Sequence, residues 1–128
     1  MPQHKILLVD DSPTVILWQR LILEGESFQV CIATDGEEAL QVARSEQPDL
    51  ILLDVVMPRM NGFAACRALR QDAELRDVPI LMVTTRSEMA SVMEGFSSGC
   101  NEYITKPIDR AELLAKVRNY LELPESAQ

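Results

Sequence analysis

Short apolar runs alternate with longer amphipathic segments along the whole chain. Five runs rich in β-branched and aliphatic residues predict strands, at residues 5–9, 28–33, 50–53, 80–83 and 103–105. Five segments with apolar residues at helical spacing predict helices, at residues 13–24, 35–45, 63–72, 87–98 and 109–121. Strands and helices that alternate at such short spacing predict right-handed crossovers and a parallel sheet covered on both faces. We therefore expect an α/β fold with a doubly wound, five-stranded parallel sheet.

Capping residues mark where several of these helices begin. Ser12 supplies an N-cap, and Pro13 is a proline at the first helical position. Two further helices begin with acidic capping pairs, Asp35 with Glu38 and Asp109 with Glu112.

Polar side chains follow four of the five predicted strands at the point where each strand ends. Parallel strands place these ends at one edge of the sheet, in the crevice where open α/β sheets bind ligands. The side chains expected to meet there are Asp10, Asp11, Asp54, Thr84 and Lys106. Asp54 is of most interest, because it ends an apolar run and is followed by the turn-forming pairs Met-Pro and Asn-Gly.

This set of side chains suits phosphoryl chemistry. Three carboxylates in one crevice repel one another unless a cation joins them, and a ligand set made only of oxygen atoms favours Mg²⁺. Lys106 can neutralise a phosphoryl group, and Thr84 can donate a hydrogen bond to it. Asp54 can then act as the nucleophile and form an acyl phosphate.

Composition and charge narrow the range of functions. The 128 residues suffice for one domain, and 47% hydrophobic with 25% charged residues is typical of a globular protein. A net charge of −8 argues against direct nucleic-acid binding by this domain. No apolar run approaches the roughly 20 residues of a membrane span, and the start of the chain has no signal-peptide pattern. We therefore expect a cytoplasmic location without membrane association.

The histidine and cysteine content argues against two kinds of enzyme. His4 is the only histidine, so a histidine-based triad or a zinc site with several histidines lacks ligands. The three cysteines are widely spaced among apolar or small neighbours, which predicts buried free thiols at Cys31, Cys66 and Cys100.

Four motifs, each at a predicted strand end, together resemble a known family. They are Val-Asp-Asp-Ser at 9–12, Leu-Leu-Asp-Val-Val-Met-Pro-Arg-Met-Asn-Gly at 52–62, Thr84, and Lys106-Pro107. In this order they resemble the receiver domains of bacterial two-component response regulators, and the chain is similar in size to the single-domain chemotaxis type. The resemblance covers about residues 4–122 and implies a flavodoxin-like, CheY-like sandwich. We expect one receiver domain over residues 1–128, with 123–128 as a polar tail.

The resemblance implies a role for each carboxylate. Asp54 would accept a phosphoryl group from a sensor histidine kinase or a histidine phosphotransfer protein. Asp11, Asp54 and the backbone carbonyl of Val56 would hold Mg²⁺, with Asp10 acting through water.

The resemblance also implies how the signal leaves the site. Lys106 and Thr84 would contact the phosphoryl group, and Thr84 and Tyr103 would act as switch residues. The expected output is a change in the face formed by the fourth helix, fifth strand and fifth helix, read by a downstream protein or an output domain. Such a protein is a signalling switch that assists only its own phosphorylation and dephosphorylation, not an enzyme with other substrates. Thr85 is bulkier than the residue usual in the family, which leaves the access of water to the phosphoryl group open.

Three alternatives remain open at this point. The chain can be a receiver module from a larger regulator with a separate output domain. A haloacid-dehalogenase-like phosphatase also uses an aspartyl phosphate and Mg²⁺, but it needs an acid where this chain has Val56. A flavodoxin-like cofactor carrier binds phosphate with its first loop, and here Asp10 and Asp11 would repel a phosphate.

The first predicted helix has more apolar side chains than one buried stripe requires. Val15, Trp18 and Ile22 suffice to cover the sheet. The apolar residues left for the flanks and for solvent are Ile16, Leu17, Leu21 and Leu23. We predict that Leu17 and Leu21 belong to the face that binds the phosphodonor protein, or failing that to a face for weak self-association. In the fourth helix we predict an inward stripe of Met89, Val92, Met93 and Phe96.

Overall fold

A five-stranded parallel sheet forms the centre of the molecule in the computed structural model, which describes residues 3–57, 60–85 and 96–123. The strands are β1 (Lys5–Val9), β2 (Gln29–Ala33), β3 (Leu50–Asp54), β4 (Ile80–Thr84) and β5 (Glu102–Thr105). Their order is β2-β1-β3-β4-β5, and every pairing is parallel. The predicted doubly wound α/β sheet is therefore confirmed.

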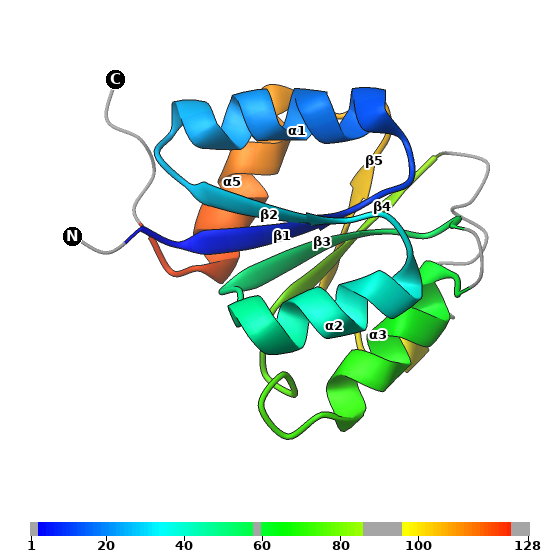
Figure 1. Ribbon diagram of the computed structural model, residues 1–128. Coiled ribbons are helices and arrows are strands. Elements are labelled where there is room, and N and C mark those ends of the chain that lie inside the picture. The colour runs from blue at the N-terminus through cyan, green and yellow to red at the C-terminus, as the bar shows by residue number, and fades with distance from the viewer. Residues whose placement is uncertain (1–2, 58–59, 86–95, 124–128) are drawn as a thin grey trace.

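Helices cover both faces of this sheet (Figure 1). One face carries α1 (Pro13–Gly25) and α5 (Arg110–Tyr120), and the other carries α2 (Gly36–Glu46) and α3 (Gly62–Gln71). Of the helix predicted at 87–98, only residues 96–98 lie in the described part, and they are helical. None of the described helices is long and apolar enough to cross a membrane.

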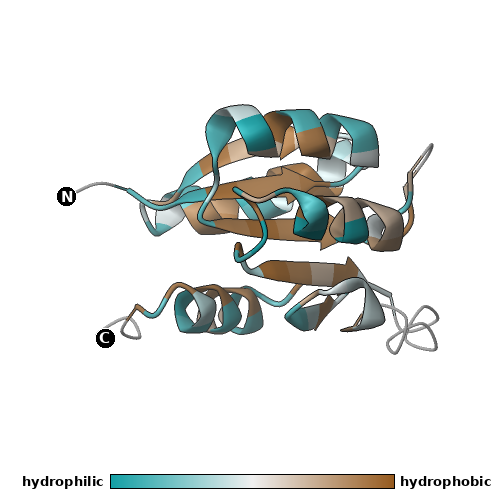
Figure 2. Cartoon of the chain, turned by 90° about the horizontal axis from the view of Figure 1, so that it is seen from below, coloured by the Kyte–Doolittle hydropathy of each residue, from teal (hydrophilic) through white to brown (hydrophobic). Residues whose placement is uncertain are grey.

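Alternate residues along the central strands face the two helical layers. Towards α2 and α3 lie Leu7, Val9, Ile51, Leu53, Ile80 and Met82. Towards α1 and α5 lie Ile6, Leu8, Leu50, Leu52, Leu81 and Val83. Burial on both faces explains why these strands are continuous apolar runs rather than alternating ones. Figure 2 shows the hydrophobic strands between helices with polar outer surfaces.

Side-chain caps begin the helices as predicted. The N-cap bonds are Val15 N to Ser12 Oγ (3.4 Å), Glu38 N to Asp35 Oδ1 (2.8 Å) and Glu112 N to Asp109 Oδ2 (2.9 Å). The carboxylate of Glu38 in turn accepts a hydrogen bond from the backbone N–H of Thr34 at 2.6 Å. These bonds satisfy N–H groups that have no partner within the helix.

The buried stripe of α1 differs from the predicted one. The residues that α1 buries are Ile16, Gln19, Ile22 and Leu23, whereas Trp18 is 45% exposed. The prediction is therefore wrong for Trp18. The indole of Trp18 reaches sideways to the segment before α5, where its N–H donates to the carbonyl of Ile108 at 3.0 Å. Periodicity could not choose between two stripes that are both apolar, because the contact with α5 decides how the helix is rotated.

Phe96 is also less buried than predicted. It is 48% exposed, and its ring meets that of Tyr103 edge to face with centroids 5.2 Å apart. Since β5 is an edge strand of the sheet, Phe96 packs on the rim and not inside the core. The other members of the predicted stripe, Met89, Val92 and Met93, lie outside the described residues.

The cysteines are free thiols, as predicted. Cys66 and Cys100 are buried, but Cys31 on the edge strand β2 is only half-buried, which corrects the prediction of full burial. Burial raises the pKa of Cys31 and of Cys100 to about 11. Thiols with such pKa values are poor nucleophiles near neutral pH.

Candidate functional site

The predicted polar residues meet at the edge of the sheet where β1, β3, β4 and β5 end. Asp54 and Thr84 are the last residues of their strands, and Asp10 directly follows β1. Sheet-like hydrogen bonds continue past the strands, from Asp10 N to Ala33 O (3.2 Å) and from Lys106 N to Thr84 O (2.6 Å). These backbone hydrogen bonds therefore fix the positions of the residues that carry the polar side chains.

Three carboxylates form the acidic part of the site. Oxygens of Asp10, Asp11 and Asp54 all lie within 4.8 Å of one another. Asp10 and Asp54 are almost fully buried, at 1% and 3% exposure, while Asp11 is exposed. Oδ1 of Asp10 accepts a hydrogen bond from the backbone N–H of Ser12 at 2.9 Å, but its buried Oδ2 has no hydrogen-bond donor. A buried carboxylate oxygen that accepts no hydrogen bond can bind a cation.

Lys106 is the basic part of the site. Its Nζ lies 3.1 Å from Oδ1 of Asp54 and 3.3 Å from Oδ2 of Asp10. The second contact is an ion pair without hydrogen-bond geometry, which agrees with the absence of a donor at that oxygen. Burial acts to lower the pKa of Lys106, but attraction to Asp54 and Asp10 outweighs burial and raises that pKa. One ammonium balances only one of three carboxylates, so the cluster keeps an excess of negative charge.

Two glycines bring neighbouring segments close to the site. A Cβ on Gly62 would overlap the carbonyl oxygen of Asp54, and the N–H of Gly62 donates to Val55 O at 2.8 Å. A Cβ on Gly36 would lie 2.6 Å from the carbonyl oxygen of Met60. Only glycine allows α3 and α2 to start this close to the segment after β3. The sequence indicated a turn at Gly62, but nothing in its pattern indicated these close approaches.

The two predicted switch residues and the predicted backbone ligand of the metal differ in burial. Thr84 is fully buried, and its hydroxyl donates to the carbonyl of Thr85 at 3.3 Å. Tyr103 is buried on β5, with its ring against Phe96. Val56 is exposed and lies two residues beyond Asp54. The structure therefore groups the three aspartates with Lys106, and places Tyr103 within the core that α2 and α3 cover.

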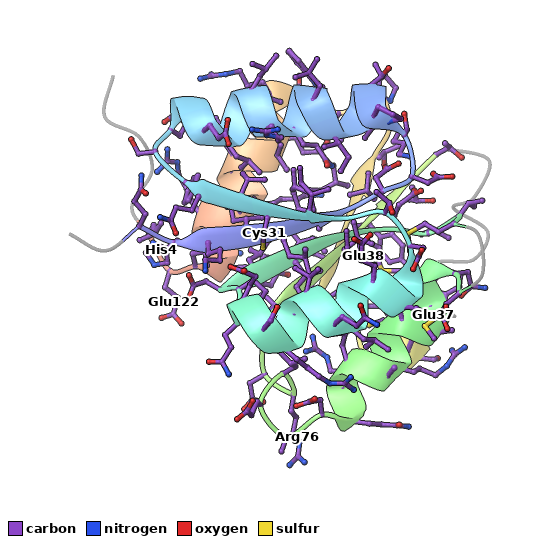
Figure 3. The ribbon with its side chains drawn as sticks, in the orientation of Figure 1. His4, Cys31, Glu37, Glu38, Arg76 and Glu122 are labelled. Atoms are coloured by element: carbon purple, nitrogen blue, oxygen red, sulfur yellow. The ribbon has the colours of Figure 1, made fainter. Side chains whose placement is uncertain are left out.

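His4 lies at the opposite end of the molecule. Figure 3 labels it where β1 begins, whereas Glu37 and Glu38 lie at the end where α2 begins and the strands terminate. The histidine is therefore far from the acidic cluster, in agreement with the exclusion of a histidine-based triad.

The topology and the strand-end cluster together define the class of protein, a CheY-like α/β domain with an acidic site. The family model described as "Response regulator receiver domain" matches residues 6–118. Protein PilH of Pseudomonas aeruginosa is 40% identical over 117 residues, covering 91% of this chain and 97% of PilH. The DNA-binding response regulator MtrA of Mycolicibacterium smegmatis is 40% identical over 116 residues, covering 91% of this chain and 50% of MtrA.

A solved structure gives the same result. The receiver domain of a sensor histidine kinase from Pseudomonas aeruginosa, with a magnesium ion coordinated in its active-site cleft, matches with a TM-score of 0.88. It is 29% identical, and the match covers 94% of this chain and 99% of that one.

The chain belongs to the response regulator receiver domains. Proteins of this family act as signalling switches and not as classical enzymes, so the phosphatase and the flavin carrier are set aside. The chain spans about half the length of the first curated relatives that it matches, 50% of MtrA and 53% of a second regulator.

Proposed function

We propose that Asp54 is the phosphoacceptor of this receiver domain. The observation that carries the proposal is the position of its carboxylate, buried at the end of the central strand β3 and 3.1 Å from the ammonium of Lys106. Asp10 and Asp11 share this site with it, but Oδ1 of Asp10 accepts a hydrogen bond from the backbone N–H of Ser12, and Asp11 is exposed. Asp10 and Asp54 are both buried and both paired with Lys106, but only Asp54 ends the middle strand of the sheet, β3.

In the proposed reaction a phosphoryl group passes from a histidine of the donor protein to the carboxylate of Asp54. An oxygen of Asp54 forms a bond to phosphorus while the P–N bond of a phosphohistidine on the donor protein breaks. The leaving imidazole takes up a proton, and Asp54 becomes an acyl phosphate. With acetyl phosphate as donor, a P–O bond breaks and acetate leaves. Lys106 stabilises the added negative charge, since its Nζ already lies within ion-pair distance of Asp54.

The acidic residues fit a bound Mg²⁺. The buried Oδ2 of Asp10, which accepts no hydrogen bond, and the clustered oxygens of Asp11 and Asp54 form the hard, oxygen-only donor set that Mg²⁺ prefers. We propose that Asp11, Asp54 and the carbonyl of Val56 hold the ion, with Asp10 acting through water. When bound, Mg²⁺ neutralises charge on the phosphoryl oxygens.

Mass spectrometry after incubation with acetyl phosphate and Mg²⁺ tests the proposal. The protein is expected to gain one phosphoryl group, and peptide mapping is expected to place it on Asp54. A gain on another residue, or none at all, would contradict the assignment. Wild-type protein in EDTA is the control and should gain no phosphoryl group.

Adding Mg²⁺ is expected to stabilise the fold. The ion binds the folded cluster and relieves repulsion among its carboxylates, so saturation at a hundred times the dissociation constant adds about 2.7 kcal/mol to the free energy of unfolding. Thermal melts with and without MgCl₂ measure the effect at matched ionic strength. Glu37→Gln, which removes an exposed carboxylate of α2, should keep the increase, and Asp11→Asn should lose most of it. A melting temperature unaffected by Mg²⁺ would count against the metal site.

Lys106→Ala is expected to leave some phosphorylation but to weaken the structural response. The ammonium joins Asp54 to the segment after β5, so its removal disconnects the phosphoryl group from β5 and α5. NMR chemical-shift changes of residues 89–121 on phosphorylation, compared between wild type and variant, measure the response. Equal changes in the two proteins would show that Lys106 does not couple the site to this face.

We further propose that Thr84 and Tyr103 take part in this response. The hydroxyl of Thr84 is bonded to Thr85 O, so it must turn away from that carbonyl to reach a phosphoryl oxygen. Tyr103 lies on the neighbouring strand opposite Met82, two positions before Thr84 in the β4–β5 register, and its ring packs on the exposed Phe96. A change at Thr84 therefore has a short path to the surface beside β5, where a downstream protein or an output domain would read it.

The exposed apolar side chains of α1 support a docking role. Leu17 and Leu21 are 56% and 59% exposed, so part of the apolar surface of α1 faces solvent, as predicted. They lie on a helix whose N-terminus adjoins Asp11. A donor protein that brings a phosphohistidine to Asp54 must approach this end of the molecule. We propose that the partner is a sensor histidine kinase or a histidine phosphotransfer protein and that it covers Leu17 and Leu21. Weak self-association through the same face is the alternative.

A further inference from the structure

A hydrogen bond joins α1 to the segment that carries Lys106. The indole Nε1 of Trp18 donates to the carbonyl oxygen of Ile108 at 3.0 Å, across 90 positions of sequence. Ile108 lies two residues after Lys106, whose ammonium binds Asp54. The bond therefore ties the middle of α1 to a short loop between the catalytic lysine and α5.

Ile108 is buried in the core that α1 and α5 cover, but part of its loop borders a hollow on the side of α1. An apolar hollow of about 200 Å³ separates the two, lined by Thr14, Val15, Trp18, Lys106, Pro107 and Ile108. Atoms beside a hollow lack contact partners on that side, so van der Waals packing restrains them less than it does in a filled core. The hydrogen bond from Trp18 crosses this region and supplies a directional restraint that packing does not.

We propose that Trp18 is a positioning residue for Lys106. By holding the carbonyl of Ile108, the indole sets the loop so that the ammonium of Lys106 reaches Asp54. Small displacements of a group that must meet a transition state slow the reaction, so loss of this restraint slows phosphoryl uptake. The proposal rests on the roles assigned above to Asp54 and Lys106, and it explains why a tryptophan that covers little of the core lies at this place in α1.

The same geometry connects the docking face to the site. Trp18 is 45% exposed and adjoins Leu17 and Leu21 on the surface of α1. A partner that covers these leucines also touches the indole that holds the loop of Lys106.

A second link between α1 and α5 provides a matched control. Glu26, the C-cap of α1, binds Arg110 at 3.1 Å and Arg118 at 2.6 Å. Both arginines belong to α5 itself, so this link fixes the helix pair, whereas Trp18 holds the loop before α5. Glu26→Gln therefore loosens the contact between α1 and α5 while leaving the bond from Trp18 to Ile108 in place.

The test is a double-mutant cycle on the rate of phosphoryl uptake from acetyl phosphate with Mg²⁺. Trp18→Phe keeps the aromatic ring but removes the N–H, and it is expected to slow uptake about threefold to tenfold, as the loss of one hydrogen bond allows. In the Lys106→Ala background the same substitution is expected to have no further effect, since there is no ammonium left to position. Glu26→Gln should lower the melting temperature and leave the rate within about twofold of wild type.

Two results would overturn the inference. A slowing by Trp18→Phe that is equally large with and without Lys106 would show that the tryptophan acts only through general packing. A slowing by Glu26→Gln as large as that by Trp18→Phe would show the same. Failure of the proposed function is distinct from both, because the wild-type protein would then gain no phosphoryl group on Asp54.

A measurement on the unmodified protein does not depend on any variant folding. Trp18 is the only tryptophan, so the wild type gives a single indole N–H resonance. Slow exchange of this proton with solvent and a shift on phosphorylation are expected, because the bond connects it to the loop of Lys106. An indole proton that exchanges as fast as in a solvated tryptophan would overturn the inference.

Discussion

Replacement of Asp54 by asparagine is expected to abolish phosphoryl uptake from acetyl phosphate while the fold is retained. The amide is close to the carboxylate in shape, but it is not a nucleophile towards phosphorus under these conditions. It also removes one of three clustered negative charges, so no loss of folding stability is expected from charge repulsion. Intact-mass spectrometry after incubation with acetyl phosphate and Mg²⁺ measures uptake, and circular dichroism checks the fold.

A control substitution separates the acceptor from its acidic neighbours. Asp35→Asn alters a buried carboxylate that caps α2 outside the cluster, so uptake should proceed, and little stability should be lost because asparagine caps helices about as well as aspartate. Uptake by the Asp54→Asn protein at the wild-type rate would mean that another residue is the acceptor.

Replacement of both Leu17 and Leu21 by glutamate is expected to slow phosphotransfer from the cognate kinase tenfold or more. Each tenfold loss corresponds to about 1.4 kcal/mol of binding free energy, which the loss of two well-buried apolar contacts at an interface can supply. Uptake from acetyl phosphate should be unchanged, because both side chains are exposed and neither contributes to the core. Phosphotransfer assays with the kinase and with acetyl phosphate measure the two rates side by side.

A control is needed to distinguish the effect of added negative charge from the effect of lost apolar contacts. The double substitution changes the net charge by two negative units, and Arg76→Glu makes the same change at a residue far from α1 (Figure 3). Arg76→Glu is expected to leave phosphotransfer nearly unchanged. If the leucine variant lost both activities and melted at a lower temperature, the two leucines would be part of the core and not of a docking face.

Local patterns in the sequence determined the strands, the caps and the residues gathered at the strand ends. Continuous apolar runs occur where β3 and β4 are covered on both faces, and a polar residue, Asp54 or Thr84, ends each run at the edge of the sheet. Once the strands are parallel, their carboxyl ends share one edge, so Asp10, Asp54 and Lys106 could be placed together without a structure. The exposure of Leu17 and Leu21 followed from a helix with more apolar residues than it could bury.

Contacts between distant segments were decided only by the tertiary structure. The rotation of α1 buries Ile16 and exposes Trp18, because α1 contacts both the sheet and the loop before α5. Phe96 lies on a rim because β5 ends the sheet. Gly62 must be glycine because α3 begins against the backbone of β3. Each depends on how elements pack against one another in space, and hydrophobic periodicity carries no information about such packing.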